Sequence, residues 1–189
     1  MQTMKNIKIW LGLAYIVFLG LFLYFLLTRI GLDELTSYDF LKSNSEYLIN
    51  FKKSNIIFSS FVFILFGVIW ISVLQGFGSP LGLICGYIFG PYLGTLIFSF
   101  TFALGASVTF IIANFFFKDF IKEKIQNNFN YLNNKIRDNQ FFAVALLRFL
   151  GGIPIQIQNL IPVLFDIKLK FYFLGTLLGV VIQALIVCS

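Results

Sequence analysis

The fold class of this chain is decided by the sequence GFGSPLGLICGYIFGPYLG, residues 76–94. These residues lie inside an apolar stretch without a charged side chain that runs from Ser54 to Phe117. A membrane-spanning helix needs about 20 residues, so this stretch holds either three spans with minimal turns or two spans and a segment that does not cross. Glycines and prolines crowd into its middle third, and this middle third decides between the two arrangements.

The glycines and prolines make this middle third unsuitable as an ordinary lipid-facing helix. Each glycine costs a helix about 1 kcal/mol relative to alanine, and each interior proline costs about 3 kcal/mol. Interrupted backbone at membrane depth is tolerated only where protein or a water-filled cavity surrounds it. We therefore predict a span over 56–75, a re-entrant hairpin over 77–94 with its turn near Gly90–Pro91, and a further span over 95–117.

The composition agrees with a membrane protein. Hydrophobic residues make up 59% of the 189 residues and charged residues only 12%, whereas a soluble domain carries about 25% charged residues. The 26 Phe residues exceed what a soluble domain of this size buries. The net charge of +6 comes from basic residues in short segments between apolar stretches, which is typical of a membrane surface and not of a nucleic-acid-binding face.

The remaining segments complete a polytopic all-α helical bundle. We predict an N-terminal span over 10–30, retained because no signal-peptide cleavage pattern follows it, and an amphipathic interfacial helix within 31–55. A polar segment over 118–140 precedes a second re-entrant segment over 141–163, which is interrupted by glycines and prolines. A last span covers 169–188. The chain then has about four transmembrane helices and two opposed re-entrant hairpins.

Two domains are predicted from this order of segments. Residues 1–55 form an N-terminal span with an interfacial segment, and residues 56–189 form the main membrane domain. The chain ends at Ser189 directly after an apolar stretch, as expected if the C-terminus is incomplete. The lysines of 31–55 and 118–140 place both segments on the cytoplasmic side, whereas Lys5 and Lys8 favour the opposite orientation.

Enzyme chemistry has little support in the sequence. The chain has no histidine, which excludes His-dependent hydrolases and His-containing zinc sites. No acidic residue falls between Lys53 and Lys118, so a paired-carboxylate mechanism is absent from this region. Cys85 and Cys188 both lie in apolar stretches and are expected to be free thiols. We predict no enzymatic activity, no cofactor and no metal.

Arg148 is the most informative single residue. It follows an apolar segment that begins at Phe141, which places it about 10 Å into the membrane if the segment is helical. An arginine at membrane depth costs at least about 2.5–3.5 kcal/mol, so it is a functional candidate. Its planar guanidinium suits phosphate, because it can bind two oxygens at once. The alternatives are an arginine that extends to the interface or one that binds carbonyls freed near Gly151–Pro154.

Five amide side chains also fall at apparent membrane depth. They either line a substrate path or satisfy interrupted backbone, and the sequence leaves both roles open. These residues are Asn114, Gln156, Gln158, Asn159 and Gln183.

The glycines Gly78, Gly82, Gly86, Gly90 and Gly94 recur every four residues and would form one smooth stripe on a helix. The stripe serves either close helix packing alone or a thin, movable hairpin beside a substrate path. Both halves of the membrane domain also run from an interrupted segment into a glycine-containing span. Such a repeat is typical of transporters with a site near the midplane.

Several of these features together resemble the DedA superfamily, whose members are also called VTT-domain or SNARE-associated Golgi proteins. The resemblance covers about residues 56–188. The residues that carry it, in chain order, are the run Gly86-Tyr87-Ile88-Phe89-Gly90-Pro91-Tyr92-Leu93-Gly94-Thr95, the pair Gly105-Ala106, then Arg148, Pro154, Asn159, Thr176 and Gly179.

The resemblance implies two opposed re-entrant helices in a small bundle and a role in moving lipids. The lipid would be a scrambled phospholipid or a recycled polyprenyl phosphate. We expect Arg148 to contact a lipid phosphate, and we expect the substrate path to include Asn159, Gln156 and Pro154. The hairpin and packing positions are expected to be Gly86, Gly90, Pro91, Gly94, Gly105, Thr176 and Gly179.

The chain departs from the family pattern in three ways. Asn114 stands where relatives usually carry an arginine, and Gly151 and Ile182 stand where they usually carry prolines. The acidic residue that many relatives carry near the first hairpin is missing, so proton coupling is not expected.

Three functions therefore remain open. The first is lipid translocation in the cell membrane, with membrane lipids as partners and a homo-oligomer as an option. The second is a membrane structural or assembly factor without a transported substrate. The third is an ion-coupled solute transporter, which the missing acidic residue disfavours.

Overall fold

The computed structural model describes residues 17, 20, 21, 24, 55–74, 78–125, 136–150 and 153–189. Within these residues every regular element is a helix, which confirms the all-α class. The helices are α5 (Ile56–Leu74), α6 (Gly78–Phe89), α7 (Pro91–Ile125), α9 (Gln140–Phe149), α10 (Ile155–Leu164) and α11 (Leu169–Cys188).

Three of these helices are long and apolar enough to cross a membrane. They are Ile56–Val73, Pro91–Phe116 and Leu169–Cys188. By length and composition these segments agree with the spans predicted over 56–75, 95–117 and 169–188, while the number of crossings and of re-entrant segments stays a prediction. The predicted N-terminal span and interfacial helix lie outside the described residues, apart from four helical positions. The predicted division into two domains therefore stays a prediction.

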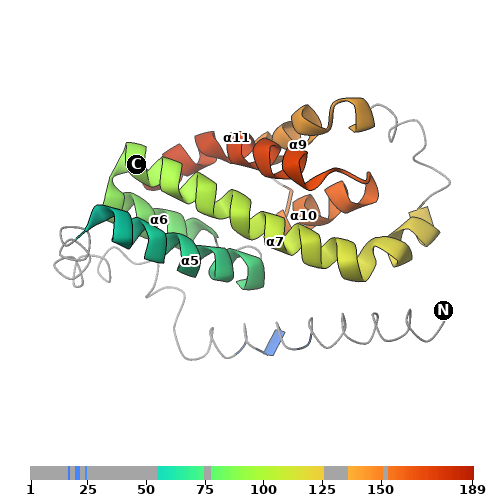
Figure 1. The fold of residues 1–189 in the computed structure, drawn as a ribbon, viewed down its shortest axis with the longest axis horizontal. Helices are drawn as coiled ribbons and strands as arrows, with labels where there is room; N and C mark the ends of the chain where they lie inside the picture. Colours follow the sequence, from blue (N-terminus) through green and yellow to red (C-terminus); the bar gives the residue numbers. More distant parts are fainter. Residues whose placement is uncertain are drawn as a thin grey trace.

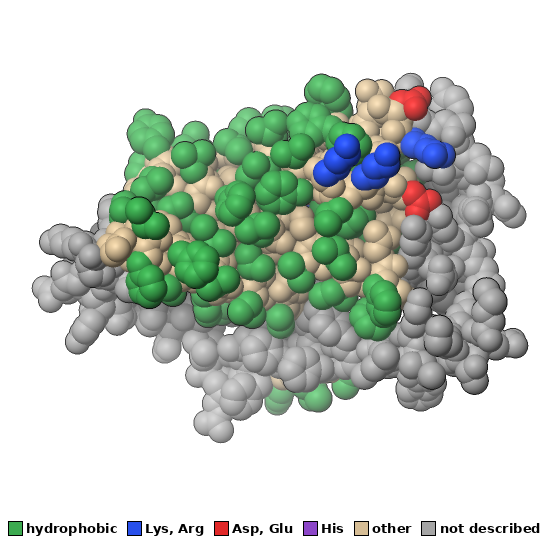
Figure 2. All heavy atoms as spheres, viewed as in Figure 1, with side chains coloured by type: hydrophobic (Ala, Val, Ile, Leu, Met, Phe, Trp, Pro, Cys, Tyr) green, Lys and Arg blue, Asp and Glu red, His purple; other side chains and the backbone are tan. Residues whose placement is uncertain are grey.

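The central element is α7, which packs against α5, α6, α10 and α11, while α9 packs against α11 (Figure 1). Phe98, Phe102 and Phe110 of α7 are buried in the core. The outer surface is apolar as well. Figure 2 shows hydrophobic side chains over most of the described surface in that view, with the described charged side chains gathered at one end. Such a surface is stable in lipid and unstable in water.

The start of α5 is fixed by Asn55, whose side-chain oxygen accepts hydrogen bonds from the backbone N–H of Ile57 (3.0 Å) and Phe58 (3.2 Å). The outward side chains of α5 are apolar and exposed, which suits contact with lipid. The largest of them are Ile57, Phe58, Phe61, Leu65, Phe66 and Ile69.

Glycines allow α5 to approach α7 closely. A Cβ on Gly105 would lie 2.7 Å from Cβ of Ile71, and a Cβ on Gly67 would overlap the side chain of Thr101. Both helices run in the same direction, because residues 67 and 71 of α5 meet residues 101 and 105 of α7 in the same order. Small residues at the contact are what closely packed membrane helices require.

The junction between α6 and α7 lies at Gly90 and Pro91. Gly90 has a left-handed φ of +84°, which ends α6, and Pro91 is the first residue of α7. The predicted turn is therefore present. The predicted hairpin over 77–94 needs a correction, because residues 91–94 are the first turn of the long helix α7 and not a separate returning arm. A proline at the first helical position does not interrupt the helix that follows, since its missing N–H would have no intrahelical partner there.

The glycine stripe of α6 serves close packing at most of its positions. A Cβ on Gly86 would overlap the backbone of Cys188, and one on Gly82 would lie 2.6 Å from the side chain of Val187. Gly94 faces the backbone of α6, with the Cys85 carbonyl oxygen 3.0 Å from an added Cβ. These contacts bring α6 against the C-terminal end of α11. Cys85 and Cys188 are buried there as free thiols.

Polar side chains on α7 are mostly satisfied by its own backbone. Each of four hydroxyl groups donates a hydrogen bond to the carbonyl oxygen four residues earlier, so it can sit at membrane depth at low cost. These residues are Thr95, Thr101, Ser107 and Thr109. Among the described residues, the buried atoms Ser99 Oγ and Asn114 Oδ1 have no hydrogen-bond partner.

Helices α9 and α10 form a helical hairpin. The side-chain oxygen of Gln140, at the start of α9, accepts a hydrogen bond from the backbone N–H of Lys168, just after α10 (2.8 Å). The chain therefore returns to the level at which α9 begins. The turn into α11 uses Asp166, which adopts a left-handed φ of 50°. This geometry agrees with the re-entrant segment predicted over 141–163, whose position relative to a bilayer stays a prediction.

Replacing Gly86 by alanine is expected to destabilise the protein by about 1–3 kcal/mol, because the new methyl group forces α6 away from the backbone of Cys188. Thermal unfolding in detergent measures this change. Gly20→Ala is the matched control, since Gly20 is helical and has no atom within 4 Å of an added Cβ. Equal stability of the two variants would show that α6 does not pack on α11 in this way.

Candidate functional site

The candidate site is built around Arg148, near the end of α9. Its side chain is only 1% exposed, although it carries a full charge in an apolar protein. It points inward from α9, whose opposite face carries exposed Phe142, Leu146 and Phe149. The arginine is therefore enclosed by protein, which disfavours the alternative that its side chain extends to the membrane interface.

The guanidinium is held by oxygen atoms from two other helices. From α10, Gln158 Oε1 accepts from Nη1 (3.2 Å) and Asn159 Oδ1 accepts from Nη2 (2.6 Å). From α11, Tyr172 OH accepts from Nη2 (2.5 Å) and Thr176 Oγ1 accepts from Nε (3.4 Å). We call these five residues the Arg148 cluster. Four of the five N–H donors of the guanidinium are thus used by neutral side chains.

The charge of Arg148 has no carboxylate beside it among the described residues. The two acidic side chains that the structure describes, Asp138 and Asp166, are both exposed. Neutral acceptors satisfy the N–H groups but leave a net positive charge in the cluster. Such a charge is poorly screened in a low-dielectric surrounding, so it produces a strong local potential.

Aromatic rings enclose the guanidinium. Its central carbon lies 5.5 Å from the ring centroid of Tyr172 and 5.9 Å from that of Phe102, distances at which a cation is attracted to the ring face. Tyr172 in turn stacks on Phe110, with centroids 4.4 Å apart and an angle of 16° between the planes. Phe102 and Phe110 belong to α7, so the central helix completes the enclosure.

Two glycines of α11 let α9 come close enough for this arrangement. A Cβ on Gly179 would lie 2.6 Å from Cβ of Arg148 and 2.7 Å from the carbonyl oxygen of Ala145. A Cβ on Gly175 would lie 2.8 Å from the carbonyl oxygen of Phe141. The spacing of four residues between the glycines places both on one face of α11, where α9 packs.

Among the described residues around the break between α9 and α10, the freed carbonyl oxygens accept hydrogen bonds from glutamines and not from Arg148. Gln158 Nε2 donates to the carbonyl oxygens of Leu150 (3.4 Å) and Ile153 (3.2 Å). Gln183 Nε2 donates to the carbonyl oxygen of Arg148 (3.0 Å). The alternative role considered for Arg148, binding freed carbonyls, therefore belongs to these two amides.

The ring of Phe102 lies between the start of α6 and Arg148 at the end of α9. The start of α6 packs on it, since a Cβ on Gly78 would lie 3.2 Å from its ring, and Arg148 lies over the same ring. Along α7, Phe102 is about 16 Å from Pro91 and about 21 Å from Phe116, the ends of the candidate span. The Arg148 cluster is thus near the middle of that span.

Only some of the residues that were predicted to line the substrate path belong to the Arg148 cluster. Arg148 and Asn159 are in direct contact, and Thr176 and Gly179, proposed as packing positions, also touch the arginine. Gln156 is exposed on α10 and lies outside the cluster.

Pro154 precedes α10, where it occupies the N-cap position, and is also exposed.

Tyr172 belongs to the cluster but was not predicted from the sequence. Its position four residues before Thr176 and seven before Gly179 puts all three on one helix face, and this spacing is the signal that could have found it.

These features define an integral membrane protein with several apolar helices around a buried polar cluster. The chain belongs to the VTT-domain family, because the family model of the VTT domain matches residues 74–189, which include the whole Arg148 cluster. This match confirms the resemblance to the DedA superfamily.

The chain is similar to Transmembrane protein 41 homolog of Dictyostelium discoideum, with 25% identity over 122 residues. The match covers 61% of this chain and 36% of the relative, so the chain spans only about a third of that protein's length. No solved structure matches the chain.

Tyr172→Phe removes the hydroxyl that accepts from Arg148 and donates to Asn159 (3.0 Å) but keeps the stacked ring. We expect a loss of about 1–2 kcal/mol in the free energy of unfolding, because the buried charge loses an acceptor. Denaturation in detergent measures it. Tyr87→Phe, at a tyrosine that is 37% exposed, is the control and should change stability by less than about 0.5 kcal/mol. A loss no larger than the control's would contradict the hydrogen bonds of the cluster.

Proposed function

We propose that this chain assists the movement of phosphate-bearing lipids from one leaflet of the membrane to the other. The observation that carries this proposal is the charge of Arg148 near the middle of the α7 span, with no carboxylate beside it in the part of the chain that the structure describes. A charge costs several kcal/mol at this depth and adds little stability to a bundle that could pack with apolar residues instead.

A fixed cation at mid-depth lowers the main barrier to lipid movement. That barrier is the transfer of a charged headgroup through hydrocarbon, where an anion is as costly as the arginine itself. Opposite charges attract strongly in a low-dielectric surrounding, so Arg148 stabilises a phosphate near it most when the phosphate is at the midplane. The guanidinium also keeps one N–H on Nη1 beyond the four hydrogen bonds of the cluster.

The short helices support a path for the headgroup. Helix α6 has 12 residues and α9 and α10 have 10 each, or about 18 and 15 Å, so none crosses a hydrocarbon layer of about 30 Å. Gln156 is an exposed amide on α10, and Pro154 is exposed beside it. Gln156 offers an amide N–H to a headgroup on the outer side of α10, while Asn159 holds Arg148 on the inner side. The carbonyl oxygen of Pro154 already accepts from the backbone N–H groups of Ile157 and Gln158, so Pro154 would border the path without binding the headgroup.

The lipid is proposed by its chemistry alone, as a phospholipid that is scrambled or a polyprenyl phosphate that is flipped. The cell membrane as location, a homo-oligomer and the lack of enzymatic activity stay predictions. The name of the Dictyostelium relative says only that it is a transmembrane protein.

A membrane assembly factor without a transported substrate is the second candidate. The enclosure of Arg148, which is 1% exposed and has four hydrogen bonds, favours it, because a fully satisfied cluster also fits a purely structural role. Purified protein that moves no lipid but co-isolates in fixed proportion with a partner would favour this candidate over lipid transport.

Reconstitution of the purified chain into phospholipid vesicles tests lipid movement directly. Fluorescent phospholipid in the outer leaflet is bleached by a reductant that does not cross the membrane, and the slow phase reports movement between leaflets. Arg148→Gln is expected to slow this phase by about tenfold or more, which corresponds to a rise of about 1.4 kcal/mol in the barrier. Arg148→Lys keeps the charge and is expected to lose less.

Tyr92→Phe is the control, because Tyr92 is 81% exposed at the start of α7 and lies outside the Arg148 cluster. Its rate should stay within about twofold of the unmodified protein, since an exposed side chain away from the cluster contributes little to the barrier. An Arg148→Gln variant that folds and moves lipid at the unmodified rate would rule out the proposed role of the charge. If Arg148→Gln does not fold, the rate of Arg148→Lys decides the same question.

A further inference from the structure

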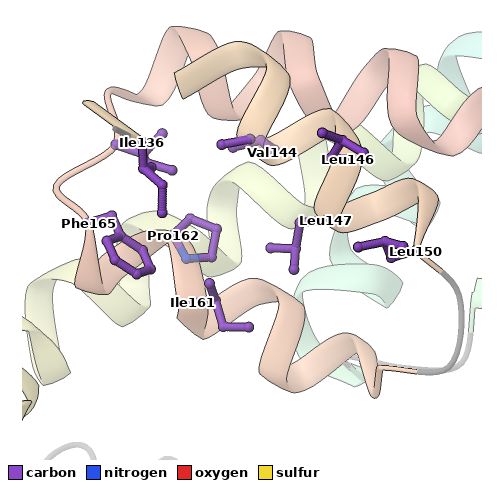
Figure 3. A pocket seen from close by; sticks show the side chains of 10 residues that line it. Ile136, Val144, Leu146, Leu147, Leu150, Ile161, Pro162 and Phe165 are labelled. Carbon is purple, nitrogen blue, oxygen red and sulfur yellow. The ribbon is translucent and has the colours of Figure 1, made fainter. Parts of the chain in front are cut away.

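An apolar cavity of about 190 Å³ lies between the arms of the α9–α10 hairpin. Every side chain that lines it is apolar. Figure 3 shows Ile136 and Phe165 at one end of the cavity, Leu150 at the other, and Leu147 and Ile161 projecting into the space between the arms. The two arms therefore do not fill the space between them, although the segment is the one predicted to enter the membrane.

The end of the cavity near Ile136 and Ile167 is bordered by charged residues. Arg137 and Lys168 follow these two residues, and a single side chain holds their backbones together. Gln140 Nε2 donates to the carbonyl oxygen of Arg137 (3.1 Å), and Gln140 Oε1 accepts from the N–H of Lys168 (2.8 Å). The arginine and the lysine thus share one rim.

The charge of this rim is mixed, with an excess of basic groups. Lys170 is exposed in the first turn of α11, and its ammonium lies 4.8 Å from the ring centroid of Phe171. Asp138 and Asp166 are exposed close by in the sequence. Among the described residues of this end, three basic and two acidic side chains are therefore exposed.

We propose that this cavity binds one acyl chain of a glycerophospholipid, with the phosphate at Arg137 and Lys168. An entirely apolar cavity open to a bilayer is filled by hydrocarbon, because the lipid chains are the surrounding solvent. The length of the hairpin arms, about 15 Å, matches part of an acyl chain that extends from the interface to Leu150. Basic residues at the rim attract the phosphate electrostatically.

This inference rests on the proposed function, to which it adds an entry site. Val144 and Leu147 line the cavity, and the next residue after Leu147 is Arg148. The far end of the cavity, at Leu150, lies beside the carbonyl that Gln158 of the Arg148 cluster binds. A lipid held here has its phosphate at the interface and its chain directed toward the depth of the arginine.

Photocrosslinking in vesicles tests the site. The full chain is reconstituted with a phosphatidylglycerol that carries a photoreactive group in one acyl chain, and in parallel with a diacylglycerol that carries the same chain but no phosphate. Mass spectrometry then locates the labelled residues. We expect phosphatidylglycerol to label 140–150 and 155–164 in clear excess over the lipid-facing side of α5, and diacylglycerol to show no such excess.

Variants test the two parts of the site separately. Ala143→Phe fills the cavity and should abolish the excess labelling, whereas Leu96→Phe, at a residue that is 65% exposed on α7, should not. Lys168→Glu should reduce labelling about fivefold or more, since about 1 kcal/mol of attraction is lost. Labelling spread evenly over all lipid-facing helices, or equal labelling by both lipids, would overturn the proposal even if every variant failed to fold.

The outcomes also separate this site from the proposed function. Specific labelling of α9 and α10 by a protein that moves no lipid would support the site and refute lipid transport. Lipid movement by a protein without the specific labelling would support transport and refute the entry site.

Discussion

A charged guanidinium at the depth of hydrocarbon must be given acceptors by the protein, and this requirement organises the described structure. Arg148 receives two amide oxygens from α10 and two hydroxyl oxygens from α11, while aromatic rings of Tyr172 and Phe102 cover it. The chain must turn back after α9 for α10 to deliver its amides. The buried charge therefore depends on the hairpin, because a charge removed from water needs the acceptors that α10 supplies.

The architecture of the main membrane domain could be predicted from the sequence because apolar length and helix-breaking residues act locally. The last span, 169–188, agrees with α11, and Gly90–Pro91 does separate two helices. The hairpin predicted over 77–94 was wrong in its second arm. A proline inside a helix interrupts it, whereas a proline at the first position can begin a helix. Which of these applies to Pro91 depends on how α6 packs on α7 and α11.

The site was only partly predictable, because its members come together through tertiary contacts. The cost of burying a charge singled out Arg148, and Asn159 was also proposed. Gln156 and Gln158 cannot be ranked from the sequence, since the rotation of α10 decides that Gln158 faces the arginine and Gln156 faces outward. Tyr172 looks like an ordinary interfacial aromatic residue in the sequence, because its contact with Arg148 depends on the packing of α11 against α9. The sequence also does not tell whether the acceptors around Arg148 are neutral, because this depends on where the acidic residues lie in space.

The most direct test of this arrangement is the depth of α9 and α10 in a bilayer. Spin labels placed singly at exposed positions of both helices report depth through their accessibility to oxygen and to a water-soluble relaxation agent. We expect the depth to increase from Phe142 to Phe149 and then to decrease along α10, through Ile157 and Leu160, as the chain returns to the side where it started. A depth profile that continues from Phe149 across to the opposite surface at Leu160 would contradict the hairpin and the buried position of Arg148 that depends on it.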